Sequence, residues 1–225
     1  MVATPAHLLR SATALGNEEV MRIRNDFPIL HRSVNGHPLV YLDSGATSQN
    51  PLSVLEAEQE FYEQRNSAVH RGAHYLAVEA TEAFEDARET VAAFIGADPE
   101  ELIWTSNATE GLNLLSYSFL NASLPGAAAE AARFALAAGD EIVVTEMEHH
   151  ANLIPWQELA ARTGAVLKFI PVDDAGALDL EAAARLIGDR TRVLAFTHAS
   201  NVLGTINPVD TLVSLARRVG ALVVL

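Results

Sequence analysis

The stretch IVVTEMEHHANLIPW, residues Ile142–Trp156, runs from a short apolar segment into a polar one that contains two adjacent histidines. The apolar part, Ile142–Glu146, has the length and composition of a buried β-strand. Polar side chains that follow such a strand lie where open α/β sheets bind their ligands. Two questions follow: which sheet the strand belongs to, and what His149 and His150 serve.

Segments with strand and helix character alternate along much of the chain. Further strands are predicted at Leu39–Asp43, Leu102–Ser106, Val166–Val172, Arg192–His198 and Ala221–Leu225. Apolar residues with helical spacing occupy residues 112–119, 180–187 and 209–219. Asn207 and Pro208 suit the N-cap and first turn of the last of these helices. This alternation predicts an α/β fold with a mainly parallel sheet flanked by helices.

The first hundred residues are predicted to be mainly helical. Residues 1–24 are expected to form a loose tail and the start of a first helix. A second helix is expected from Pro51 to about Gln64, and a long amphipathic helix over residues 76–95. Residues 121–140 are rich in alanine and exceed a normal connection in length, so they predict an insertion that forms a surface helix.

Composition excludes several classes of protein. The net charge is −14 and no cluster of lysine and arginine exists, so neither nucleic acid nor an anionic membrane surface is an expected partner. No run of 18 apolar residues occurs, and we expect no membrane span. Cysteine is absent, which removes disulfides and thiolate–metal sites. Lys168 is the only lysine in the sequence.

The histidines do not predict a metal site. On a helix, His149 and His150 would point about 100° apart and could not share an ion. His70 and His74 have the i, i+4 spacing that a helical metal site needs, but Gly72 lies between them. No further ligand motif accompanies either pair, and we predict no metal.

Two polar turns follow predicted strands and favour ligand binding. Asn107 and Glu110 have capping-box spacing at the start of a helix, where free N–H groups and the helix dipole attract anions. Thr109 adds a hydroxyl, although an ordinary capped helix would look the same. The loop Thr197–Gly204 carries His198, Ser200 and Asn201, and it is either a ligand loop or simply a polar one. No nucleophile elbow, dinucleotide fingerprint or Walker loop occurs.

Taken together, the motifs resemble a known family of enzymes. The segments are YLDSGATSQNP, AVHRGAHYLA, ATEAFEDAR, TSNATEGLN, EMEHHANLIPWQ and THASNVLGTINP, in this order. In sequence and spacing they resemble the cysteine desulfurase/selenocysteine lyase group of the class V aminotransferase superfamily, and most closely the SUF-type cysteine desulfurases. The resemblance extends from about Asn25 to Leu225.

The resemblance implies a homodimeric, cytoplasmic enzyme with pyridoxal 5′-phosphate as cofactor and the fold type I of pyridoxal-phosphate-dependent transferases. Residues 25–225 would form the N-terminal portion of its large domain. The implied reaction converts L-cysteine to L-alanine and passes sulfur on, as a persulfide, to a sulfur-acceptor protein for iron–sulfur cluster assembly. Alternative functions for the chain are those of a selenocysteine lyase, another class V aminotransferase, or a non-catalytic truncated remnant.

The resemblance also assigns roles around the cofactor. It implies that His149 stacks on the pyridine ring and assists proton transfer. Thr109 and the backbone of Ala108 match the phosphate-binding element. Asn201 matches the residue that contacts the ring oxygen of the cofactor and the carboxylate of the substrate. His150 receives no implied role, and a structural hydrogen bond is expected.

Further positions match the substrate side of the family's site. The turn at Gly45 and Ala46 resembles the loop near the substrate. His70 and Arg71 resemble a segment that approaches the site of the partner subunit.

Other elements of the family follow later in its sequences and have no match here. They are an acid after a strand like Ala221–Leu225, a Ser-x-His-Lys segment whose lysine holds the cofactor, a mobile catalytic cysteine and carboxylate-binding arginines. We therefore expect an N-terminal fragment without the rest of the large domain and the small domain. Lys168 lies mid-strand, and an outward-facing position is expected. Because later strands would complete the sheet, we expect this chain alone to fold poorly and to be inactive.

Overall fold

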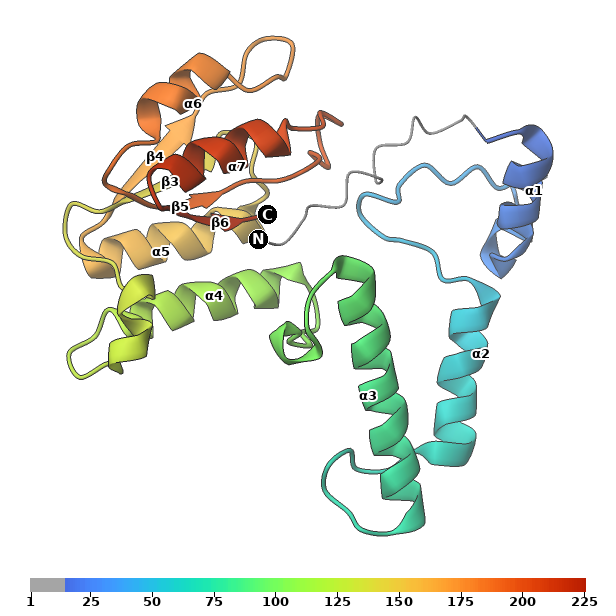
Figure 1. The fold of residues 1–225 in the computed structure, drawn as a ribbon. Coiled ribbons are helices and arrows are strands. Elements are labelled where there is room, and N and C mark those ends of the chain that lie inside the picture. The colour runs from blue at the N-terminus through green and yellow to red at the C-terminus, as the bar shows by residue number, and fades with distance from the viewer. Residues whose placement is uncertain (1–14) are drawn as a thin grey trace. The chain divides into compact units, whose positions relative to one another are not determined.

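The computed structural model describes residues 15–225 (Figure 1), which divide into two compact units, one that ends at Leu102 and one that begins at Ile103. Most of the predicted N-terminal tail lies outside the described residues. Each unit has its own internal contacts and is described by itself. No helix within residues 15–225 is long and apolar enough to cross a membrane.

The first unit is mainly helical, as predicted. Its elements are α1 (Asn17–Asn25), η1 (Pro28–His31), β1 (Ser33–Val34), β2 (His37–Pro38), α2 (Leu52–Glu60), η2 (Phe61–Arg65), α3 (Tyr75–Ile95) and η3 (Pro99–Glu101). β1 and β2 form a small antiparallel hairpin. Asn35 and Gly36 connect the two strands, and both have positive φ, as a type I′ turn requires.

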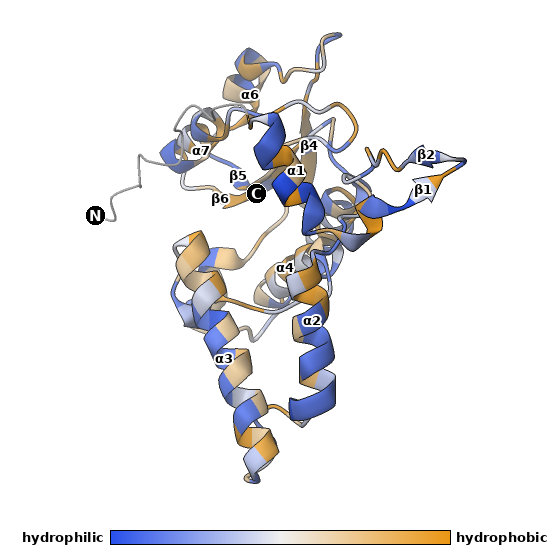
Figure 2. Ribbon diagram, turned by 90° about the vertical axis from the view of Figure 1, so that its right-hand side faces the viewer, coloured by the Kyte–Doolittle hydropathy of each residue, from blue (hydrophilic) through white to orange (hydrophobic). Residues whose placement is uncertain are grey.

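α3 confirms the predicted amphipathic helix. His74 caps its start, where Nδ1 accepts a hydrogen bond of 3.4 Å from the backbone N–H of Ala77. Gly96 ends the helix with φ +73°, a left-handed conformation that glycine adopts without steric cost. Hydrophobic residues run the length of the helix among hydrophilic ones (Figure 2). Much of the apolar face is uncovered, and the Phe94 side chain is 90% exposed.

The strand predicted at Leu39–Asp43 is wrong. This segment has no regular secondary structure, and Leu42 is 90% exposed. Its backbone joins no strand ladder in the described part of the chain: Leu39 N–H donates to the carbonyl of Arg32, and the Asp43 carbonyl accepts from the turn that follows it. A strand requires such a partner, because its hydrogen bonds are made to another strand. The Tyr41 hydroxyl instead donates to the carbonyl of Thr47 at 2.6 Å.

The second unit is a parallel sheet covered by helices, and the α/β prediction is confirmed. Its four strands, in the order β4-β3-β5-β6, are β3 (Glu141–Thr145), β4 (Val166–Ile170), β5 (Thr191–Ala195) and β6 (Leu222–Val224). The helices are α4 (Ala108–Ala122), η4 (Ala129–Phe134), η5 (His150–Asn152), α5 (Ile154–Thr163), α6 (Leu180–Leu186) and α7 (Val209–Arg218). β3 has the predicted length but starts one residue earlier, whereas β4, β5 and β6 are each two residues shorter than predicted.

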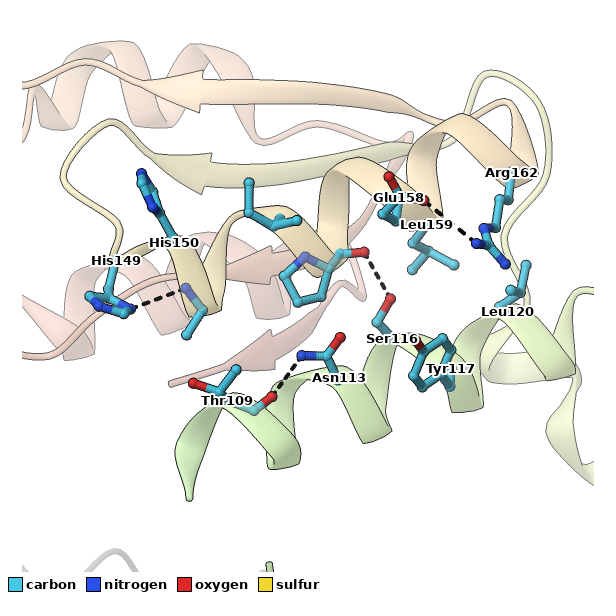
Figure 3. A pocket seen from close by; sticks show the side chains of 13 residues that line it. Thr109, Asn113, Ser116, Tyr117, Leu120, His149, His150, Glu158, Leu159 and Arg162 are labelled. Carbon is cyan, nitrogen blue, oxygen red and sulfur yellow. Dashed lines mark hydrogen bonds and ion pairs between the residues drawn. The ribbon is translucent and has the colours of Figure 1, made fainter. Parts of the chain in front are cut away.

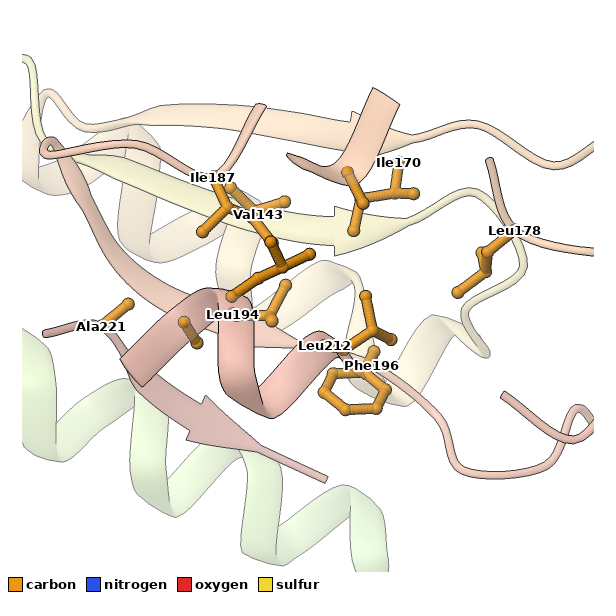
Figure 4. Close-up of a cluster of buried hydrophobic side chains, with 11 residues drawn as sticks. Val143, Ile170, Leu178, Ile187, Leu194, Phe196, Leu212 and Ala221 are labelled. Carbon is orange, nitrogen blue, oxygen red and sulfur yellow. The ribbon is translucent and has the colours of Figure 1, made fainter. Parts of the chain in front are cut away.

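Successive residues of β3 point to opposite faces of the sheet and enter two separate cores. Val143 packs with Leu194, Phe196 and Leu212 on the face covered by α7 (Figure 4). The neighbouring Val144 belongs to a second cluster on the α4–α5 face. Each fully buried side chain of this size contributes roughly 1.5–3 kcal/mol, so the two faces together hold the sheet between its helices.

Two local predictions in this region are wrong, and a third agrees with the structure. Leu102–Ser106 forms no strand, since no segment of residues 15–225 pairs with it, and Ile103 is 68% exposed. The alanine-rich segment at residues 121–140 does contain a surface helix, the short 3₁₀ helix η4, whose Phe134 stacks on Phe119 with 5.9 Å between the ring centroids. Asn207 does not cap α7, because its side chain is buried and donates to the carbonyl of Thr197 at 2.8 Å.

Candidate functional site

The carboxyl ends of β3 and β5 lie side by side in the second unit. The two strands are parallel neighbours, with Val144 paired to Ala195. The turn at residues 146–153 and the loop at residues 196–208 therefore leave the sheet at the same edge. This is the edge where open α/β sheets bind ligands.

Glu148 ties the two chain segments together at this edge. Its Oε1 accepts hydrogen bonds from the Thr145 hydroxyl and, at 3.0 Å, from the backbone N–H of Thr197. Its Oε2 accepts one from Nδ2 of Asn152 at 2.7 Å. Asn152 in turn accepts a bond of 2.9 Å from the indole N–H of the fully buried Trp156. The turn is thus fixed to both strands and to the core.

His149 begins the 3₁₀ helix η5 and caps it. Its Nδ1 accepts a hydrogen bond of 3.1 Å from the backbone N–H of Ala151, and its carbonyl accepts one of 2.8 Å from Asn152. An acceptor nitrogen must carry a lone pair, so in the neutral ring the proton is assigned to Nε2. The imidazole is exposed and therefore accessible to a ligand.

The start of α4 is arranged to attract an anion. Asn107 caps it by accepting a 2.9 Å bond from the N–H of Glu110, and the Glu110 carboxylate accepts a 2.5 Å bond from the N–H of Ser106. This confirms the predicted cap, with Ser106 as the reciprocal donor. The backbone N–H groups of Ala108 and Thr109 make no hydrogen bond within residues 15–225. They remain available, together with the Thr109 hydroxyl and the helix dipole.

The position of Glu110 in the first turn of α4 changes the pKa of its carboxyl group. Hydrogen bonds from Ser106, chiefly from its backbone N–H, hold the pKa of the Glu110 carboxyl below its usual range. The carboxylate occupies the Ser106 N–H, so an incoming anion would use the donors of the first helical turn instead.

Thr109 and His149 lie at the same end of one cavity. The cavity has a volume of about 530 Å³ and lies between α4 and the η5–α5 segment (Figure 3). Leu120 and Arg162 mark its opposite end. The Ser116 hydroxyl donates to the carbonyl of Pro155 at 2.8 Å across its floor, which joins α4 to α5. The structure therefore brings together the predicted phosphate-binding residue and the predicted ring-stacking histidine.

Asn201 is on the loop after β5 and does not line this cavity. The side chain is exposed and makes no hydrogen bond in the described part of the chain. The loop that carries it is braced, because Thr205 donates its hydroxyl to the carbonyl of Gly176 at 2.7 Å. An isolated bridge between Ala199 and Ile206 closes the loop. Asn201 is thus held at the tip of a supported turn.

The remaining predicted residues belong to the first unit. Gly45 and Ala46 form a turn in which the N–H of Ala46 donates to the carbonyl of Asp43 at 3.1 Å. His70 has a φ of +58°, which is unusual for a residue other than glycine. Its Nε2 is 3.0 Å from Oε1 of Glu85. Arg71 follows directly, and its backbone N–H donates a 3.4 Å bond to the carbonyl of Ala68.

Two residues have roles that the sequence did not predict. Glu148 received no function, although an acid directly before a histidine pair at the end of a strand is the available signal. Lys168 was expected to face outward, but its side chain is only 29% exposed and its Nζ forms a 2.8 Å salt bridge with the buried Glu141. The bridge satisfies a carboxylate that would be costly to bury alone. No group of three His, Asp or Glu side chains suited to a metal occurs in residues 15–225.

Fold and site define an α/β protein in which a helix N-terminus and a histidine turn face one cavity near the carboxyl edge of a parallel sheet. Comparison with known families identifies which one: the aminotransferase class-V family matches residues 40–225, and the chain belongs to it.

Individual relatives agree with this assignment and confirm the resemblance. A probable cysteine desulfurase from Synechocystis sp. is 48% identical over 200 residues, which cover 88% of this chain and 45% of the relative. Probable cysteine desulfurase 2 from Mycobacterium leprae is 52% identical over 208 residues, covering 92% and 48%. The chain spans about half the length of the curated relatives it matches.

Solved structures give the same result for the fold. The apo structure of a cysteine desulfurase from Thermococcus onnurineus has a TM-score of 0.78 and 38% identity, covering 90% of this chain and 46% of its own. The cysteine desulfurase CsdA from Escherichia coli has a TM-score of 0.72 and 35% identity, with coverages of 90% and 47%.

Proposed function

We propose that the chain forms part of a pyridoxal 5′-phosphate-dependent cysteine desulfurase, which converts L-cysteine to L-alanine and passes on the sulfur as a persulfide. The observation that carries the proposal is the cavity shared by Thr109 and His149 in a chain of the aminotransferase class-V family. Relatives named cysteine desulfurase, at 46–52% identity, support the choice of substrate.

The residues present fit the cofactor. A phosphate is best bound where unpaired backbone N–H groups meet a helix dipole, and α4 offers those of Ala108 and Thr109 beside a hydroxyl. A flat heteroaromatic ring is best covered by a flat side chain, and the exposed imidazole of His149 supplies one. When bound, pyridoxal 5′-phosphate supplies the electron sink for chemistry at the amino-acid Cα.

His149 would act in two ways in this proposal. Its ring covers the cofactor, and its Nε2–H is the donor it presents to groups bound there, since Nδ1 is engaged by Ala151. Asn201, on its braced loop, would contact the ring oxygen of the cofactor and the carboxylate of the substrate. The Gly45–Ala46 turn would contact the substrate, and the segment of His70 and Arg71 would approach the site of a partner subunit.

Lys168 is not the cofactor-tethering lysine in this proposal. Its Nζ is held by the buried carboxylate of Glu141, which also accepts a 3.0 Å bond from Arg190. Releasing the amine would leave that carboxylate with one partner whose side chain is largely exposed. We assign Lys168 to the stability of the sheet.

The setting of the enzyme is part of the same proposal. It includes a homodimer, a sulfur-acceptor protein, a contribution to iron–sulfur cluster assembly and a cytoplasmic location. Residues 25–225 would be the N-terminal portion of the large domain.

The first test is to read the coding sequence beyond the codon for Leu225. A continuing frame that encodes an acid after β6, then a Ser-x-His-Lys segment, then a cysteine supports the enzyme. A stop codon at that point contradicts a catalytic role and favours a remnant.

The second test is to express the product of that frame and assay it with L-cysteine. Equimolar alanine and protein-bound sulfane sulfur are expected. Selenocysteine serves as the competing substrate. A kcat/KM much larger with selenocysteine than with cysteine would mean that the enzyme is a selenocysteine lyase and not a cysteine desulfurase. Absence of alanine from both substrates would reject the proposal.

A further inference from the structure

The Glu148 carboxylate accepts three hydrogen bonds at the site, and none of the roles proposed above involves it. Glu148 is half-buried and directly precedes His149. Its two carboxylate oxygens accept from three neutral donors, the Thr145 hydroxyl, the Thr197 N–H and the Asn152 amide. The carboxylate forms no ion pair with any cation in residues 15–225.

The three donors come from three different elements. Thr145 ends β3, Thr197 follows β5 by two residues, and Asn152 ends η5. One carboxylate therefore fixes the separation of the two strand ends and the position of the short helix between β3 and α5. The Asn152 amide cannot turn over to adapt, because its oxygen is engaged by the indole N–H of the buried Trp156.

This network acts directly on His149. The histidine is bonded covalently to Glu148 on one side, and its carbonyl is bonded to the N–H of Asn152 on the other. The carboxylate thus belongs to the residue before His149 and also binds the side chain of Asn152, whose N–H donates to the His149 carbonyl. A change in that carboxylate would move the His149 ring before it disturbed the sheet, whose strands are paired independently.

We propose that Glu148 is a positioning residue, whose carboxylate sets the place and orientation of the His149 imidazole at the carboxyl edge of the sheet. Its effect on a bound cofactor rests on the proposed function, whereas its effect on the unloaded protein does not.

The decisive variant is Glu148→Gln, which preserves shape and turns one acceptor into a donor. Any rotamer of the glutamine faces at least one N–H or O–H donor with an NH₂ group, and the charge that strengthens all three bonds is lost. Thr145→Val is a milder variant that removes one donor from a buried position. Glu181→Gln is the matched control, because the Glu181 side chain is 91% exposed and lies 3.7 Å from the guanidinium of Arg185 on the surface of α6.

The first measurement uses the unloaded protein. In Glu148→Gln we expect the Thr197 amide to exchange with solvent roughly tenfold faster or more. We expect the ¹³Cδ2 resonance of His149 to shift. Thr145→Val should move both in the same direction by less, and Glu181→Gln should move neither. A role confined to stability would lower the unfolding temperature and leave the His149 resonance of the folded protein unchanged.

The second measurement uses protein loaded with pyridoxal 5′-phosphate. The visible circular dichroism of the bound cofactor should change in Glu148→Gln toward the spectrum of His149→Ala. An unchanged Thr197 exchange rate and an unchanged His149 resonance in Glu148→Gln would overturn the inference. If that variant does not fold, the same two results in Thr145→Val overturn it.

The two proposals can fail separately. A wild-type protein that binds no pyridoxal 5′-phosphate contradicts the proposed function, while the exchange and resonance data still decide the role of Glu148. A wild-type protein that binds the cofactor, with Glu148→Gln identical to it in every readout, contradicts only the role of Glu148.

Discussion

The backbone N–H of Ala151 donates a 3.1 Å hydrogen bond to Nδ1 of His149. This contact places the only proton of the neutral ring on Nε2. His149 would thus present a donor to the cavity, and could accept a proton at Nδ1 only by giving up the bond to Ala151. The tautomer of the ring is therefore set by one backbone amide.

The first prediction concerns that tautomer. Long-range ¹H–¹⁵N spectra of the histidine rings at neutral pH should show His149 with an unprotonated Nδ1 and a protonated Nε2. The structural hydrogen bond expected of the adjacent His150 side chain is not formed within residues 15–225, so its ring should show no comparable preference between the two neutral tautomers. A predominant Nδ1–H form of His149 would mean that the Ala151 contact does not exist in solution.

The second prediction concerns turnover in the complete enzyme. His149→Ala should leave the cofactor bound, because the proposed phosphate contacts come from α4, but should lower kcat by about 10²-fold or more, since the proposed acid–base group would be lost. Steady-state alanine production measures kcat, and the cofactor absorbance measures occupancy. His37→Ala, on the exposed β1–β2 hairpin, is the control. Undiminished turnover in His149→Ala would remove the assigned role.

The third prediction concerns Lys168. Lys168→Met should lower the free energy of unfolding by about 1–3 kcal/mol, because Glu141 stays buried with Arg190 as its remaining partner. Adding Glu141→Leu should recover most of this loss. Denaturant titrations measure both, and cofactor affinity should not change. Unchanged stability combined with lost cofactor binding would instead identify Lys168 as a cofactor ligand.

The fourth prediction concerns pH. The pKa of Glu110 is lowered in the folded protein by the hydrogen bond from the Ser106 N–H. The contribution of Glu110 to the free energy of unfolding is fully present above the pKa that its carboxyl has in the unfolded chain. It is lost as the pH falls from there through the lower pKa of the folded protein. Glu110→Gln should therefore flatten the acid limb of the stability curve. An identical acid limb in the variant and the wild type would contradict it.

The parallel sheet was predictable because local patterns specify it. The runs that became β3, β4, β5 and β6 are apolar, short and separated by helical spacing, and each was placed correctly within a few residues. Leu102–Ser106 has a similar apolar character but forms no strand. Its sequence could not reveal this, because an apolar run does not show whether a partner strand lies beside it. Strand pairing is a non-local property.

The site was predictable where its residues adjoin in sequence. The Asn107–Glu110 cap and the Thr109 hydroxyl follow from spacing along one helix. Glu148 could not be assigned, because its partner Thr197 lies 49 residues away and the contact exists only when β3 and β5 pair. Asn207 looked like a helix cap because Pro follows it. Burial redirected its side chain to the Thr197 carbonyl.

The central claim is that the start of α4 binds the phosphate of pyridoxal 5′-phosphate. The most direct test is to titrate the wild-type protein and Thr109→Val with pyridoxal 5′-phosphate and with pyridoxal, which lacks the phosphate. The account predicts saturable binding, with the phosphorylated form bound roughly tenfold tighter or more, and a smaller difference in Thr109→Val. Equal affinities for the two compounds in the wild type, or no saturable binding of either, would contradict it.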